Sequence, residues 1–506
     1  MQMFKLSTLT GKLILLATIL ASGMAFLDST VVGIAIPSIQ KSLNADISGI
    51  QWIVNAYALM LATLILISGS LCDKFGTKRI FLIGMSLFTI FSFLCGLSSS
   101  IAQLTLFRAI QGIGAAMMVP GSLSIISTSF DSKEHGKVIG LWSGISGGVA
   151  ALGPLLGGYL VQTFSWPAIF FINIPLGILA LFITIKYVPA TKFHEGHKLD
   201  FVGTLLIFFA LLGIAYGLIS GPISGWSSPL ILVSLIGGAI MFVLFILWSL
   251  KSKQPLVPIE IFKSPLVTGA NLATLFLYFA LSGVIFFMVL NMQQVQHFDP
   301  IIAGLGLLPT ILIITFLSGP AGALSDRIGP RLPMILGPAT VAVGMALLAI
   351  TGRHANYFVN YLPGLALFGL GMSFVIAPLT KSALAVEPKY SGSASGVNNA
   401  VARVAGLLAV ALLGAIVLSF FTNNLTHKIY ASNLGNDEKT IIINQKNDLG
   451  GISIPRSFSN GSKVVAQTIV EDSFIYGFRW AMGICAFLAL LSAIISFLTI
   501  QNPRKN

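Results

Sequence analysis

The sequence predicts an all-α integral membrane protein with fourteen transmembrane helices. Of its 506 residues, 55% are hydrophobic and 9% are charged, whereas ordinary soluble domains carry about 25% charged residues. The apolar residues form long runs, and the basic residues gather in alternate loops between those runs. The net charge of +13 therefore belongs to the loops of a membrane protein and does not indicate a nucleic-acid-binding surface.

The lengths of the apolar runs predict where each span lies. A spanning helix needs about 20 mostly apolar residues. The first run is too long for the core of a cleavable signal peptide. The predicted spans are residues 12–36, 50–71, 80–97, 101–126, 138–162, 168–188, 200–220, 229–250, 266–291, 301–322, 332–351, 357–380, 393–421 and 476–500.

The basic residues predict the orientation of these spans. Positive charge stays on the cytoplasmic side of a membrane, so both termini are predicted to be cytoplasmic. The short loops on the other side carry only Lys41 and Arg353. The long segment 422–475 is then extracytoplasmic, either as a solvated hairpin or short interfacial helices, or as a lid over the exit. The basic side carries Lys5, Lys12, Lys74, Lys78, Arg79, Lys133, Lys137, Lys186, Lys192, Lys198, Lys251, Lys253, Lys263, Arg327, Arg331, Lys381, Lys389, Arg504 and Lys505.

An internal repeat divides the chain into two halves. GSLCDKFGTKR at 69–79 matches GALSDRIGPRL at 322–332 at an offset of 253 residues, and GIGAAMMVP at 112–120 matches GLGMSFVIAP at 369–378. Parallel repeats of this kind place the substrate site near the midplane between the halves. We predict an N-terminal six-helix half at 1–190, two inserted helices with a linker at 191–265, and a C-terminal six-helix half at 266–506.

The chain resembles a known family, the fourteen-span drug:proton antiporters of the major facilitator superfamily (the EmrB/QacA type). Two positions depart from the family pattern, since Gly33 stands where Asn is usual and Pro167 follows Trp166 where Arg is usual. The similarity runs nearly end to end. It rests on Leu27, Asp28, Thr30, Ala35 and Pro37 in span 1, on Gly69, Asp73, Gly76, Lys78 and Arg79 in the first repeated loop, on LTLFRAIQGIGAA at 104–116, and on GPLLGG at 153–158.

The resemblance implies a major-facilitator fold, two six-helix bundles plus two extra helices, in a bacterial cytoplasmic membrane. It implies proton-coupled export of hydrophobic or amphipathic small molecules, with no enzymatic activity, cofactor or metal. The implied partners are lipid, substrate and protons, and the sequence leaves open whether the protein works alone or with a periplasmic adaptor and an outer-membrane channel. An uptake symporter or uniporter of the same fold is the alternative. A membrane-embedded enzyme is disfavoured. The stretch GISGG at 144–148 fits the Gly-x-Ser-x-Gly nucleophile motif, but it lies within an apolar helix and not on the strand-to-helix turn that this motif needs.

Asp28 is the one acidic residue that we place in the middle of a span. A charge there costs roughly 2.5–3.5 kcal/mol, so an unpaired carboxyl prefers its neutral form and can bind and release a proton. The alternative is a structural aspartate that holds a helix contact. The resemblance implies that spans 1 and 4 line one cavity, which makes Arg108 the natural partner of Asp28. Gln111 lies one turn further along span 4, on the same face as Arg108.

A second group of residues is expected to control conformation. Asp73 and Asp326 lie at cytoplasmic helix ends, where a carboxylate can dock on the positive N-terminus of another helix. The resemblance pairs Asp73 with the start of span 13 and Asp326 with the start of span 5, and simple surface charge is the alternative. The repeated loops also contribute Gly76, Arg79 and Arg327 to this switch. The span 5 motif contributes Gly153, Pro154, Gly157 and Gly158, which permit close helix contact and a kink.

Substrate contacts are predicted from adaptable or polar side chains within the spans. Methionine and aromatic groups make adaptable binding surfaces, although ordinary membrane packing is the simpler explanation for each of them. For Arg403, packing and a role in substrate or proton handling both stay open. The candidates are Trp52, Asn55, Tyr57, Met117, Met118, Asn271, Tyr278, Gln293, Gln294 and Arg403.

Overall fold

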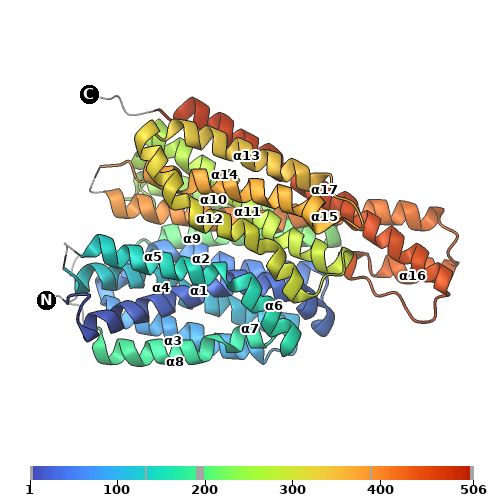
Figure 1. The fold of residues 1–506 in the computed structure, drawn as a ribbon, viewed down its shortest axis with the longest axis horizontal. Coiled ribbons are helices and arrows are strands. Elements are labelled where there is room, and N and C mark those ends of the chain that lie inside the picture. Colours follow the sequence, from blue (N-terminus) through green and yellow to red (C-terminus); the bar gives the residue numbers. More distant parts are fainter. Residues whose placement is uncertain (1–3, 132–133, 190–198, 388–389, 502–506) are drawn as a thin grey trace. The chain divides into compact units, whose positions relative to one another are not determined.

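The computed structural model describes residues 4–131, 134–189, 199–387 and 390–501 (Figure 1). The predicted domain boundary at 190–191 lies outside these residues. Within the described part of the chain, fourteen helical segments are long and apolar enough to cross a membrane. This confirms the predicted fold class. Contacts divide the chain into two compact units, which are described separately below.

Unit 1 comprises residues 1–35, 53–212 and 238–259. In this unit α3 packs against both α4 and α8, as Figure 1 shows. The α3–α4 contact is close because both helices present glycine, and a Cβ added to Gly114 would lie 2.7 Å from the carbonyl oxygen of Gly84. The helices that lie wholly or mainly in unit 1 are α1 (Leu9–Leu43), α2 (Ile47–Phe75), α3 (Thr77–Gly96), α4 (Ile101–Ser129), α5 (His135–Ala151), α6 (Gly153–Thr163), α7 (Ala168–Phe171), α8 (Asn173–Tyr187) and α10 (Pro229–Lys251).

Unit 2 comprises residues 36–52, 213–237 and 260–506. In this unit α13 packs against α14 and α17, and α11 packs against α15 and α17. The helix α9 (Phe201–Ser224) runs from unit 1 into unit 2. The other elements of unit 2 are η1 (Ile259–Lys263), α11 (Pro265–Leu290) with one π-helical turn η2 (Asn291–Val295), α12 (Pro300–Ile328), α13 (Arg331–Ala349), η3 (Tyr357–Tyr361), α14 (Leu362–Ala383), α15 (Ser391–Ala431), α16 (Asn436–Asn444), η5 (Lys446–Gly451) and α17 (Asn460–Thr499).

Several helices begin where a short polar side chain caps the first turn. Before α4, the hydroxyl of Ser100 accepts a hydrogen bond from the backbone N–H of Gln103. Before α17, Ser459 accepts in the same way from Ser462. Each hydroxyl satisfies one of the backbone donors that have no partner at a helix N-terminus.

The two repeated loops have the same backbone conformation at their glycines, as the sequence repeat predicts. Gly76 follows α2 and Gly329 follows α12, and both adopt φ of 88°, which glycine adopts without a Cβ penalty. The same offset relates Gly84 to Gly337, and a Cβ added to Gly371 would lie 2.5 Å from the carbonyl oxygen of Gly337. The α13–α14 contact in unit 2 is therefore built like the α3–α4 contact in unit 1.

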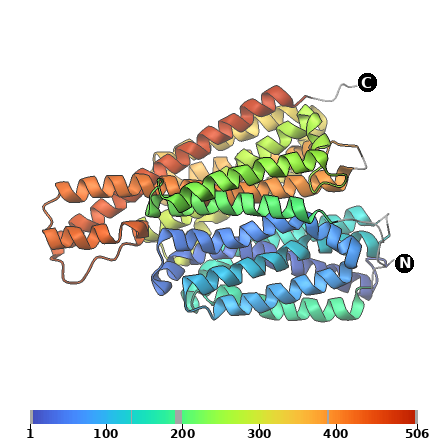
Figure 2. The same ribbon diagram turned by 180° about the vertical axis from the view of Figure 1, so that it is seen from behind.

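The segment predicted to be extracytoplasmic, residues 422–475, is largely helical. Residues 422–431 continue α15, and residues 460–475 belong to α17. Only the stretch between them, which contains α16 and η5, connects the two helices, and Figures 1 and 2 show this part of unit 2 projecting beyond its other helices. The two long helices therefore extend into residues 422–475, and the side of the membrane on which this segment lies stays a prediction.

Candidate functional site

The three residues predicted to handle protons meet inside unit 1. A guanidinium nitrogen of Arg108, Nη1, forms an ion pair with Oδ2 of Asp28. The same nitrogen donates to Oε1 of Gln111 at 2.8 Å, and Nε2 of Gln111 donates to Oδ1 of Asp28 at 3.0 Å. The exposed fractions are 0% for Asp28, 2% for Arg108 and 0% for Gln111. The three side chains thus close a triangle of charge-assisted hydrogen bonds that is shielded from solvent.

Groups from neighbouring helices complete the surroundings of Arg108. Its Nε donates to the carbonyl oxygen of Ile53 at 3.4 Å, and its guanidinium lies 4.1 Å from the ring centre of Tyr57. The Tyr57 hydroxyl in turn donates to the carbonyl oxygen of Ala25 at 3.1 Å. Cys95 adds a weak contact, with its Sγ 3.7 Å from Oε1 of Gln111. Tyr57, predicted as a substrate contact, is therefore a wall of the ion-pair site in this conformation.

A close helix contact explains why Arg108 lies over Tyr57. Gly112 is one turn after Arg108 on α4, and a Cβ added there would lie 2.6 Å from the carbonyl oxygen of Tyr57. Because glycine lets α4 approach α2, the guanidinium can cover the tyrosine ring and still reach α1. A cation over an aromatic face gains about 2 kcal/mol when it is desolvated, which helps to offset the cost of burying the charge.

The span 5 motif is joined to α1 two residues beyond Asp28. Pro154 has no N–H, so it cannot bond to the carbonyl of Ala150 one turn earlier, and the span breaks into α5 and α6 at Leu152. The Thr30 hydroxyl lies 3.1 Å from that carbonyl oxygen and 2.9 Å from the carbonyl oxygen of Leu27. A Cβ on Gly153 would overlap this hydroxyl. Gly153 therefore makes room for Thr30, and Pro154 frees the carbonyl that Thr30 can bond.

The rest of the motif continues the same contact. Gly157 is buried, and a Cβ added there would lie 3.0 Å from the carbonyl oxygen of Val31 and 2.8 Å from its side chain. Gly158 is also buried. The small residues of span 5 thus let α6 lie directly against α1, the helix that carries Asp28.

The predicted switch residues lie at helix ends, as their sequence positions suggested. Arg79, Asp326 and Arg327 are exposed. The carboxylate of Asp326 pairs with Nζ of Lys381 at 2.6 Å, a surface pair of the kind that contributes little to stability. The side chain of Asp73 lies outside the described residues, so its pairing stays a prediction.

Lys78 has a role that the sequence reasoning missed. Its Nζ donates to the carbonyl oxygens of Ile185 at 2.9 Å and Val188 at 2.6 Å, at the C-terminus of α8. Cations at a helix C-terminus satisfy free carbonyls and interact favourably with the helix dipole. The sequence did contain a signal for this role. Lys186 is the only basic residue in the last turn of α8, so the final carbonyl groups of this helix need a cation from another element.

The predicted substrate contacts of unit 1 include two packed methionines and one asparagine without a hydrogen-bond partner among the described residues. Met118 is fully buried against α3, and Met117 is half-buried beside Gly84. Asn55 is completely buried, yet neither atom of its amide has a hydrogen-bond partner among the described residues. An unsatisfied buried amide costs about 1–3 kcal/mol. Asn55 is therefore the unit 1 candidate that would gain most from a ligand.

The predicted substrate contacts of unit 2 are mostly half-buried and include a polar group shared by α11 and α15. Asn398 donates to Asn271 at 3.2 Å and to Thr274 at 2.8 Å. Further along the same two helices lie Tyr278 and Arg403, which are half-buried.

The remaining unit 2 candidates lie apart from that group. The ring of Trp52 packs against Tyr216 with centroids 6.2 Å apart. Gln293 and Gln294 are half-buried, and Nε2 of Gln294 donates to Gln40 at 2.7 Å. Among the described residues, no three His, Cys, Asp or Glu side chains lie together in a group that could hold a metal ion.

Comparisons with known proteins give a consistent result. The model of the Major Facilitator Superfamily matches residues 18–410. The multidrug resistance protein Stp of Mycobacterium tuberculosis is 33% identical over 482 residues, which cover 94% of this chain and 89% of that protein. The tetracenomycin C resistance and export protein of Streptomyces glaucescens is 29% identical over 489 residues, covering 96% and 91%. Among solved structures, an inward-facing, unoccupied bacterial homologue of the human lysosomal transporter Spinster has a TM-score of 0.69 at 17% identity, covering 97% of each chain.

Proposed function

The chain belongs to the major facilitator superfamily, and from that premise we propose that it is an antiporter. It exports hydrophobic or amphipathic small molecules across a bacterial cytoplasmic membrane in exchange for protons. The observation that carries the proposal is the buried triangle of Asp28, Arg108 and Gln111. Relatives named for multidrug resistance and for drug export support the outward direction. An uptake symporter of the same fold is less well supported, because the span 5 motif resembles that of exporters.

The triangle suggests how protonation and conformation are coupled. With Asp28 ionised, its carboxylate holds Arg108 and Gln111 of α4 against α1. A proton on Asp28 removes the charge that Arg108 balances, while Arg108 keeps Gln111, the Ile53 carbonyl and the Tyr57 ring. Binding a proton therefore loosens α1 from α4. One charge that crosses 100 mV is worth roughly 2.3 kcal/mol, or about a 50-fold substrate gradient.

Two parts of the proposal rest on sequence patterns. The distribution of Lys and Arg favours cytoplasmic termini. Transport by this chain alone and transport with a periplasmic adaptor and an outer-membrane channel are the two alternatives that the sequence leaves open.

Proton-driven dye transport in everted membrane vesicles tests the proposal. We expect wild-type protein to accumulate neutral and singly charged amphipathic dyes when the vesicle interior is acidified, and Asp28→Asn to lose this accumulation. Glu260→Gln is a matched control, because Glu260 is an exposed acid on η1. Accumulation only in right-side-out vesicles would favour uptake over export. No dependence on the pH gradient would remove proton coupling.

A further inference from the structure

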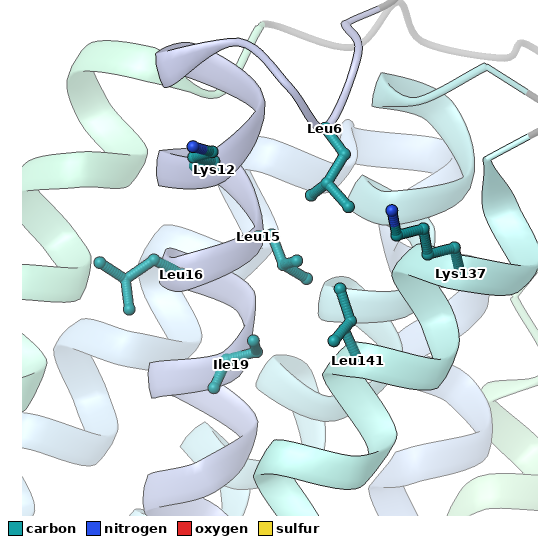
Figure 3. A pocket seen from close by; sticks show the side chains of 7 residues that line it. All are labelled: Leu6, Lys12, Leu15, Leu16, Ile19, Lys137 and Leu141. Atoms are coloured by element: carbon teal, nitrogen blue, oxygen red, sulfur yellow. The ribbon is translucent and has the colours of Figure 1, made fainter.

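Unit 1 contains a cavity that the proposed antiport mechanism does not use. This cavity of about 450 Å³ opens between the start of α1 and the start of α5 (Figure 3). Its lining consists of five aliphatic and two basic side chains. These residues are Leu6, Lys12, Leu15, Leu16, Ile19, Lys137 and Leu141.

The sequence spacing builds this lining. The α1 residues occupy positions i, i+3, i+4 and i+7, which share one helix face, and the α5 residues are four apart. The segment before α1 folds over the site, since the backbone N–H of Phe4 donates to the carbonyl oxygen of Ser129 at 2.8 Å. The N–H of Leu6 donates to Oε2 of Glu134 at 2.7 Å. These two bonds place Leu6 at the mouth of the cavity.

The charge of the site is positive. Lys12 and Lys137 are both exposed, and in the described part of the chain neither ammonium group forms an ion pair with a carboxylate. Glu134 is the acid nearest in sequence to Lys137, and its carboxylate holds the roof of the site through Leu6. The lining thus combines two cations with an aliphatic wall and contains no acidic side chain.

This combination matches an anionic lipid better than a drug. Sites for drug-sized molecules usually combine aromatic walls with a few hydrogen-bonding groups that orient the ligand, and this lining has no aromatic, hydroxyl or amide side chain. Leu16 and Leu141 are each 39% exposed, so part of the aliphatic wall is open to a ligand. The predicted orientation puts both lysines at the cytoplasmic surface, where basic pockets between spans bind anionic headgroups.

We propose that this cavity binds an anionic phospholipid of the inner leaflet. Its phosphate lies between Lys12 and Lys137, and one acyl chain lies along Leu15, Ile19 and Leu141. The proposal is independent of the transported substrate, because the cavity shares no residue with the Asp28 site.

Lipid binding to the purified full-length protein tests the proposal. The measurement is the affinity for phosphatidylglycerol and for phosphatidylcholine, determined by native mass spectrometry in detergent. We compare wild type with the double variant Lys12→Gln/Lys137→Gln. The matched control is Lys251→Gln/Lys253→Gln, which removes the same charge from exposed positions of unit 1 outside the cavity.

We expect wild type and the control to bind phosphatidylglycerol alike, and the cavity variant to bind about 30-fold more weakly, as the loss of two lysines near a headgroup predicts. Lys12→Arg/Lys137→Arg keeps both charges and should keep the affinity, which separates loss of charge from misfolding. An equal loss in the control would show general surface attraction and overturn the proposal.

Two other results would also overturn it. Equal affinity for phosphatidylcholine would show an apolar groove whose lysine stems merely cover the surface. Competition by millimolar inorganic phosphate would show a site for free phosphate and not for a lipid.

Discussion

At the scale of single residues, Asp28 carries the proposed coupling. Its side chain is 0% exposed and bonded to two residues of α4. Asp28→Asn keeps the shape and one acceptor but cannot change charge, so we expect proton-driven export to fall to background while membrane insertion stays normal. Dye transport in everted vesicles checks the first expectation, and the amount of folded protein in the membrane checks the second. Export by the variant at wild-type rate against a gradient would contradict the proposal.

Arg108 is predicted to set the proton affinity of Asp28. Nearby positive charge favours an ionised carboxyl, so in Arg108→Ala the carboxyl holds its proton more tightly. Release to the cytoplasm becomes the difficult step, and transport should fail near neutral pH and partly recover as the cytoplasmic pH rises. Arg108→Lys should perform better than Ala but below wild type, since a point charge replaces a planar fork. The measurement is the rate of dye transport against pH for all three proteins.

The Arg108 experiment needs a stability control. Removing one member of a buried ion pair costs about 3–5 kcal/mol, so the thermal stability of each variant has to be measured beside its transport. If folded Arg108→Ala protein shows an unchanged pH profile, or one moved toward acid, then Arg108 does not tune Asp28.

The sequence identified the members of this site but not its walls. A lone acid and a lone arginine stand out in apolar spans, and the resemblance implied that spans 1 and 4 meet. The carbonyl of Ile53 and the ring of Tyr57 could not be assigned to Arg108, because that contact depends on how closely α4 approaches α2 at Gly112. A backbone carbonyl leaves no mark in a sequence pattern.

At the scale of elements, Thr30 links the break in span 5 to α1. Its hydroxyl is a donor within reach of the Ala150 carbonyl, which Pro154 cannot bond. We expect Thr30→Val to lower stability by about 1 kcal/mol and to slow transport several-fold. Thr30→Ser keeps the hydroxyl and should keep both. Thermal unfolding and dye transport of the two variants provide the comparison, and equal behaviour of Val and Ser would show that the hydroxyl contributes nothing.

The element η5 is predicted to respond to pH. Gln40 donates to the carbonyl oxygen of Asp448 at 3.0 Å. Burial and, to a lesser extent, the neighbouring carboxylate of Asp46 raise the pKa of Asp448 from 3.8 to about 6. The neutral acid is favoured in the folded state, so its stabilising contribution is complete below about pH 4 and is lost as pH rises through 6. Since Asp448 is only half-buried, the effect is on the order of 1 kcal/mol.

Hydrogen exchange of residues 446–451 measures this effect. After correction for the intrinsic rate, we expect faster opening at pH 7.5 than at pH 5.0 in wild type. Asp448→Asn should open slowly at both values, because the amide does not ionise. Asp437→Asn, on the neighbouring α16, is the control and should behave as wild type. A pH dependence that persists in Asp448→Asn would assign it to another group.

The elements themselves were predictable, and their ends were less so. Apolar length located every span, because the membrane requires it. The kink in span 5 followed from Gly153 and Pro154. The extensions of α15 to Ala431 and of α17 from Asn460 lie in mixed polar sequence, where hydropathy no longer distinguishes a helix from a loop.

At the scale of the whole molecule, the same loop geometry occurs twice within one chain. Gly76 and Gly329 have equal φ values, and each donates its N–H to a carbonyl four residues earlier, at 3.0 Å from Cys72 and 2.8 Å from Ser325. The sequence offset predicted this correspondence because a glycine with positive φ has few substitutes. The partners of the acids in these loops were not predictable in the same way, since Asp326 pairs with Lys381 of its own unit.

The last prediction concerns the balance between inward-facing and outward-facing states. The resemblance pairs Asp73 with a helix N-terminus of the other half, a contact worth about 0.3–1 kcal/mol. Losing it in Asp73→Asn should therefore shift the ratio of the two states by roughly 2–5-fold and leave substrate binding intact. Cysteines introduced near the two ends of the spans report the shift through their accessibility from each membrane face, and the native Cys72, Cys95 and Cys485 are buried.

Asp326→Asn is the matched comparison, because Asp326 occupies the equivalent place in the repeat but is exposed and paired with Lys381. Both members of this surface pair belong to unit 2, so its loss should shift the ratio less than the loss of a contact between the two halves. Equal shifts would mean that both acids act as surface charge, and unchanged accessibility in Asp73→Asn would remove it from the switch. A larger effect of Asp73 would show that one chain uses the two copies of its repeated loop unequally, with the conformational bias held mainly by the first.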